Sequence, residues 1–93
     1  MLGQIELQIL TDLTKAPQNV ASAASAIETS GLTGASYKPL IFCGAQPVRG
    51  TNYWFIAEQT LVTATPERHL VKLAVNEFNG EYALVDKSIE RIF

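Results

Sequence analysis

The chain has 93 residues, 47% of them hydrophobic and 17% charged, with a formal net charge of −2; such a chain is predicted to form a single domain over residues 1–93 with one core. Its lysines and arginines are scattered along the sequence, so we expect no nucleic-acid partner. No apolar run approaches the roughly 20 residues that a membrane span requires, and no membrane partner is expected.

The redox environment is indicated by a single cysteine, Cys43. One cysteine excludes an intrachain disulfide and favours a reducing compartment. The first six residues also lack the basic flank and apolar block of a secretory signal peptide. The sequence therefore predicts a cytoplasmic protein, although a secreted chain whose signal peptide had been removed would show the same pattern.

Residues 4–10 carry the signal of a first strand. Apolar and polar residues alternate there, which is the period of a half-buried strand. The apolar positions are Ile5, Leu7 and Ile9.

A helix is predicted next. Asp12 or Thr14 can cap its start, and Pro17 is tolerated in its first turn. Gly31 is expected to end it. The spacing of its apolar residues predicts one buried stripe, formed by Val20, Ala23, Ala24 and Ile27.

The rest of the chain is predicted to form four strands, within residues 37–43, 51–62, 69–75 and 82–92. Pro39 is expected to interrupt the first of these early. The turn formers of segment 44–50 predict a short connection, and Asn79-Gly80 is the strongest hairpin signal in the chain. In segment 51–62 the two faces are expected to be Tyr53, Phe55 and Ala57 on one side and Trp54, Ile56 and Glu58 on the other.

This order of elements, strand, helix and then consecutive strands joined by short turns, is typical of an α+β domain. We expect an antiparallel sheet of four or five strands wrapped around one helix.

Chemistry-bearing motifs are sparse. The chain has one Cys and one His, too few for a zinc site, and it contains no phosphate-binding or dinucleotide-binding glycine pattern. We therefore expect no metal, no cofactor and no catalytic residue. The single alternative is a nucleophile and base pair formed by Cys43 and His69. We favour the interpretation that Cys43 packs as a small apolar residue and His69 is an ordinary surface residue.

One segment, residues 46–55, stands out from this background. Its first five residues, Gln46, Pro47, Val48, Arg49 and Gly50, resemble the Gln-x-Val-x-Gly signature of the cystatin family, and the following Thr-Asn-Tyr and aromatic residues resemble those that accompany it. The segment falls between two predicted strands, where cystatins place their first hairpin loop.

Two other parts of the chain are similar to the same family. Gly3 corresponds to the glycine of the N-terminal trunk, and Phe78, Asn79 and Gly80 fall where stefins place their second binding loop. Because the chain lacks disulfides and a signal peptide, the type it resembles is the stefin.

The resemblance implies a cystatin-like fold and reversible, tight inhibition of papain-like cysteine proteases of the cathepsin type. An N-terminal trunk and two hairpin loops would occlude the active-site cleft. The residues implied in protease binding are Leu2, Gly3, Gln46, Pro47, Val48, Arg49, Gly50, Phe78, Asn79 and Gly80. On this view Gly50→Glu should abolish inhibition and leave the fold intact.

Two departures from the family pattern concern binding: Pro47 removes a backbone donor and Arg49 adds a charge to the loop. An alternative function is a cystatin-fold binding or assembly module without a protease target, since fold alone does not fix function. We expect a monomer that can form a domain-swapped dimer if the first loop straightens.

Overall fold

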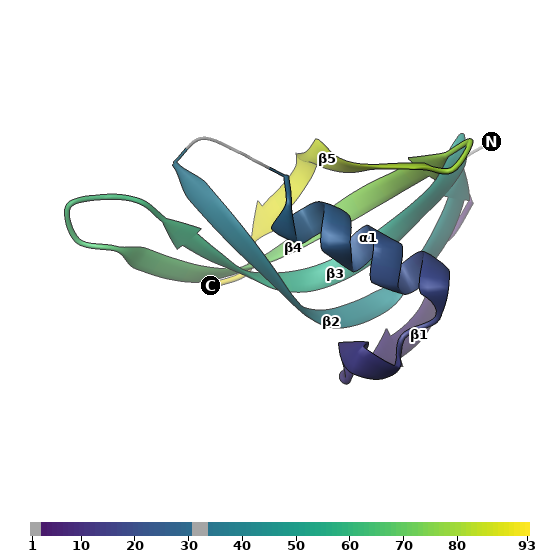
Figure 1. Ribbon diagram of the computed structural model, residues 1–93, viewed down its shortest axis with the longest axis horizontal. Coiled ribbons are helices and arrows are strands. Elements are labelled where there is room, and N and C mark those ends of the chain that lie inside the picture. The colour runs from purple at the N-terminus through teal and green to yellow at the C-terminus, as the bar shows by residue number, and fades with distance from the viewer. Residues whose placement is uncertain (1–2, 31–33) are drawn as a thin grey trace.

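The computed structural model describes residues 3–30 and 34–93, so the predicted positions Leu2 and Gly31 lie outside the described residues. Five strands form one antiparallel sheet in the order β1-β2-β3-β4-β5, and one helix packs against it (Figure 1). The predicted α+β class is confirmed, with five strands in the sheet. The elements are β1 (Glu6–Leu10), a 3₁₀ turn (Leu13–Lys15), α1 (Gln18–Glu28), β2 (Ala35–Val48), β3 (Gly50–Leu61), β4 (Glu67–Phe78) and β5 (Glu81–Arg91).

The start of α1 differs from the prediction. The side chain of Asp12 accepts a hydrogen bond from the Thr14 amide at 3.1 Å, so Asp12 caps the short 3₁₀ turn. The α-helix begins only at Gln18, directly after Pro17, and no side chain caps it. Its last residue is Glu28, and the Thr29 amide donates to the Ser25 carbonyl at 3.0 Å.

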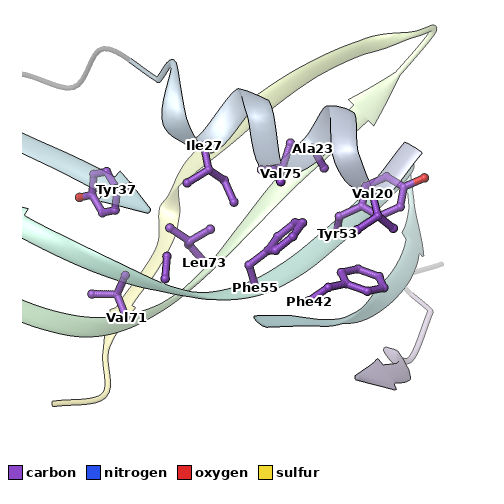
Figure 2. Close-up of a cluster of buried hydrophobic side chains, with 12 residues drawn as sticks. Val20, Ala23, Ile27, Tyr37, Phe42, Tyr53, Phe55, Val71, Leu73 and Val75 are labelled. Atoms are coloured by element: carbon purple, nitrogen blue, oxygen red, sulfur yellow. The ribbon is translucent and has the colours of Figure 1, made fainter. Parts of the chain in front are cut away.

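A single hydrophobic core lies between α1 and the inner face of the sheet (Figure 2). The predicted helix stripe supplies four of its buried residues. Phe55, Leu73 and Ile27 are completely buried. Since Tyr53, Phe55 and Ala57 are buried whereas Trp54 and Ile56 are half-buried on the opposite side, the two predicted faces of β3 are confirmed.

Strand β2 is longer than predicted because two expected breakers lie inside it. Pro39 is buried and pairs with Ala57, and a shift in register between Pro39 and Ile41 accommodates it. Gly44 is buried opposite Leu7, at a point where a side chain would overlap the Glu6 carbonyl of β1. The expected connection over residues 44–50 is therefore mostly strand, and the turn is reduced to Arg49 between the paired residues Val48 and Gly50.

The first strand is confirmed, but its apolar residues are not buried. Leu7 and Ile9 are 69% and 68% exposed, and Ile5 is 39% exposed. β1 lies at the edge of the sheet, and its pairing with β2 shifts register between Leu7 and Leu10. Leu10 is its residue that packs against the core.

Candidate functional site

Three segments that are far apart in the sequence meet at one end of the sheet, which we call the turn end: Gly3, residues 46–50 and residues 78–80 (Figure 1). The antiparallel register explains why. β2 and β3 are joined at Arg49, and β3 pairs with β4 so that Thr51 lies opposite Glu77. The β2–β3 turn therefore lies beside the β4–β5 turn.

The N-terminal segment is held against the β2–β3 hairpin at both polar groups of Gly3. The Gly3 amide donates to the Pro47 carbonyl at 2.8 Å, and the Gln46 Nε2 group donates to the Gly3 carbonyl at 3.1 Å. Gln46 is oriented in turn by Trp54, whose Nε1 donates to Gln46 Oε1 at 3.0 Å. A side chain at position 3 would overlap the Pro47 ring. Glycine is thus required at position 3 by a close approach.

This geometry changes the expected part of Pro47. Its missing amide donor was expected to weaken the loop, yet its carbonyl accepts the bond from Gly3 and its ring occupies the space beside that glycine. Pro47 therefore helps to position the N-terminal segment.

Gly50 is placed under a backbone constraint that the sequence interpretation missed. Its φ is +81°, and a side chain there would overlap the Glu77 carbonyl on β4. The expectation that Gly50→Glu leaves the fold intact is therefore wrong, because the space that Glu would need is filled by the neighbouring strand.

The β4–β5 turn is built as its sequence predicts. Asn79 and Gly80 have φ values of +53° and +81°, and positive φ at both positions is what a two-residue type I′ turn requires. The Gly80 amide donates to Glu77 Oε2 at 2.9 Å. Phe78 is 41% exposed and lies outside the core cluster, so its side chain is available at the surface.

Two contacts join the turns to each other. Asn76 Nδ2 donates both to the Arg49 carbonyl, at 3.1 Å, and to Asn52 Oδ1, at 2.9 Å. The Arg49 guanidinium carbon lies 5.2 Å from the centre of the Phe78 ring, within the range of a cation–π contact. Sequence reasoning did not single out Asn76, because its contacts follow from the β3–β4 register and leave no local pattern.

The turn end presents Pro47, Arg49, Phe78, Asn79 and Gly80 as exposed residues, with Val48 half-buried. It therefore offers apolar side chains and one cation on a backbone that is braced from three sides. Such a surface can fill a complementary cleft without undergoing much rearrangement.

Cys43 and His69 are not brought together. Cys43 lies in a groove on the outer face of the sheet, and His69 borders a different cavity. The His69 ring is within 3.2 Å of Glu67 Oε2 and 3.4 Å of the Phe93 carbonyl. Burial raises the pKa of the Cys43 thiol, with a smaller opposing effect from a backbone hydrogen bond of Ile56. A nucleophilic thiol needs a lowered pKa and a nearby base, and this arrangement supplies neither.

Two further classes of site were considered. Among residues 3–30 and 34–93, no three His, Cys, Asp or Glu side chains are grouped in a way that would bind a metal ion. The helix in this part of the chain is too short to cross a membrane.

Comparison with family models, with curated proteins and with solved structures finds no match to this chain. The hydrogen bonds, glycine positions and exposed side chains of the turn end are therefore the observations from which a function is inferred. The cystatin resemblance of residues 46–55 stays a prediction.

Proposed function

We propose that the chain is a reversible, tight-binding inhibitor of papain-like cysteine proteases, with a cystatin-like fold of the stefin type. The observation that carries the proposal is the meeting of three segments at the turn end. The signature loop, the N-terminal glycine and the second loop are the pieces implied by the resemblance, and they are bonded to one another in the folded chain.

The turn end would act as a wedge in the protease cleft. Val48 and Phe78 supply apolar contacts, and burying either would contribute about 1.5 to 3 kcal/mol. Because Gln46 and Asn76 already hold the backbone in place, binding costs little ordering entropy. Leu2, the third implied apolar anchor, lies outside the described residues, and its part rests on its position before Gly3.

Inhibition would be steric. The β2–β3 turn presents a closed hairpin whose ends are paired at Val48 and Gly50, so no extended peptide bond is offered to the protease nucleophile. The protein would block substrate access and dissociate unchanged.

The test is inhibition of papain by the purified chain, measured from steady-state rates over a range of inhibitor concentrations. Val48→Asp places a charge on the wedge and should weaken inhibition at least about tenfold, the effect of losing a buried anchor. Val62→Asp is the matched control, since Val62 is 74% exposed between β3 and β4 and distant in sequence from both turns. A folded wild-type chain that does not inhibit papain, or equal effects of the two substitutions, would contradict the proposal.

A second candidate is a cystatin-fold assembly module without a protease target. It is favoured by the exposed apolar residues on the outer face of the sheet, which inhibition does not use. Self-association without papain inhibition would support this candidate over the first.

A further inference from the structure

The outer face of the sheet, opposite α1, carries an apolar groove with a volume of about 370 Å³. Within the described residues, α1 lies only on the inner face (Figure 1). The groove crosses β1 to β4 and the segment after β5. Its apolar lining consists of Ile5, Leu7, Cys43, Trp54, Ile56 and Ile92.

The lining has the make-up of an interface. Leu7 is 69% exposed and Ile92 is 44% exposed at the rim, whereas Trp54 is half-buried in the middle strand. Tryptophan near the centre of an apolar patch, with aliphatic residues around it, is typical of binding hot spots. Scattered apolar residues are normal at a surface, but a continuous apolar groove marks a contact site.

The charges beside the groove cancel within the chain. Lys72 Nζ lies 3.2 Å from Glu90 Oε2 and 5.7 Å from the centre of the Trp54 ring. The groove therefore has no uncompensated charge of its own that would repel an identical surface. A symmetric dimer places one patch against itself, so this neutrality is a requirement for self-association.

The exposed area matches what a dimer would bury. The chain exposes 6072 Å², whereas a compact monomer of its mass exposes about 5300 Å². The excess of about 800 Å² equals the area that one partner contributes to an interface of standard size. The elongated shape, 42 × 24 × 21 Å, contributes to this excess, and face-to-face contact would reduce it.

From these observations we infer that the outer face of the sheet binds a second copy of the chain, forming a symmetric dimer without exchange of strands. The groove of each copy receives apolar side chains of the other, with Leu7 at the rim and Trp54 near the centre. The turn-end residues Val48 and Phe78 do not line the groove. The inference does not rest on the proposed inhibitory function.

The experiment is sedimentation equilibrium of the full chain over roughly a thousandfold range of concentration. We expect a reversible change from one chain to two as concentration rises. The fluorescence of Trp54, the single tryptophan, should shift to shorter wavelength over the same range because its ring loses contact with water.

Leu7→Glu and Ile9→Glu form a matched pair of variants. Both residues lie on β1 and are almost equally exposed, but Leu7 lines the groove and Ile9 borders a different cavity beside Pro17. Leu7→Glu should weaken dimerisation at least about tenfold, whereas Ile9→Glu should leave it unchanged. Circular dichroism checks that both variants are folded.

Several outcomes would overturn the inference. These are a monomer at every concentration, equal effects of the two variants, or a dimer that persists for hours after dilution, as a strand-exchanged dimer would. A chain that binds an apolar dye in the groove but stays monomeric would assign the groove to a different occupant. Papain inhibition by monomeric Leu7→Glu is scored separately, so failure of the dimer and failure of the inhibitory function can be distinguished.

Discussion

The two turns at the turn end contain glycines with the same backbone conformation and different surroundings. Gly50 and Gly80 both have φ of +81°. A side chain at Gly50 would overlap the Glu77 carbonyl, whereas one at Gly80 would meet no atom within 4 Å. Gly80 is required by the local turn alone, and Gly50 is required by the turn and by the neighbouring strand.

The comparison shows that two binding loops of similar sequence length differ in how they are held. The β2–β3 turn is enclosed by Gly3 on one side and by β4 on the other. The β4–β5 turn is held by its own Glu77 bond and by the Arg49 contact. We therefore expect substitutions in the first turn to affect folding more than equivalent substitutions in the second.

The largest effect is expected for Gly50→Ala. A left-handed conformation costs a residue with a Cβ about 1 to 2 kcal/mol, and overpacking adds about 1 to 3 kcal/mol. The free energy of unfolding should fall by about 3 kcal/mol, the sum of mid-range values for these two costs. Urea denaturation measures this change directly.

Gly80 provides the control for this prediction. Gly80→Ala should lose only about 1 to 2 kcal/mol, from the backbone conformation alone. Gly80→Asn should recover most of that loss, since Asn adopts positive φ more readily than Ala, but Gly50→Asn should not recover because its side chain still meets β4. Equal losses at the two glycines would show that β4 does not constrain the first turn.

An intermediate effect is expected for Asn76→Ala, which removes the amide that bonds both the Arg49 carbonyl and Asn52. The free energy of unfolding should fall by about 1 to 2 kcal/mol. Papain inhibition should also weaken, because the first turn loses its connection to β4.

The matched variant is Asn19→Ala, whose amide bonds Tyr53 on α1 and β3 rather than either turn. It should lose stability by about 1 kcal/mol and leave inhibition unchanged. If both variants weaken inhibition equally, Asn76 acts through general stability and not through the position of the turn.

The smallest effect is expected from the contact between Arg49 and Phe78. In a double-mutant cycle with Arg49→Ala and Phe78→Ala, the coupling energy for unfolding should be about 0.5 to 1 kcal/mol, as for an exposed cation–π pair. Arg49→Lys should keep part of this coupling. Strictly additive losses would mean that the two turns are independent.

Local patterns in the sequence determined much of the fold. The helix stripe at Val20 and Ile27, the buried face of β3 at Phe55 and the Asn79-Gly80 hairpin all agree with the structure. These features depend on periodicity and on the φ values that particular residues accept, which are properties of neighbouring residues in the chain. The same patterns named the positions that meet at the turn end.

What the sequence did not determine depends on which strands lie side by side. Pro39 and Gly44 have the residue types of turns, but β3 and β1 pair across them and keep them within a strand. The alternation of Leu7 and Ile9 predicted a buried face, yet the edge position of β1 leaves both exposed. The overlap at Gly50 and the two bonds of Asn76 arise from the β3–β4 register. Only the tertiary structure decides these contacts, because they join atoms whose separation is not encoded in any short stretch of chain.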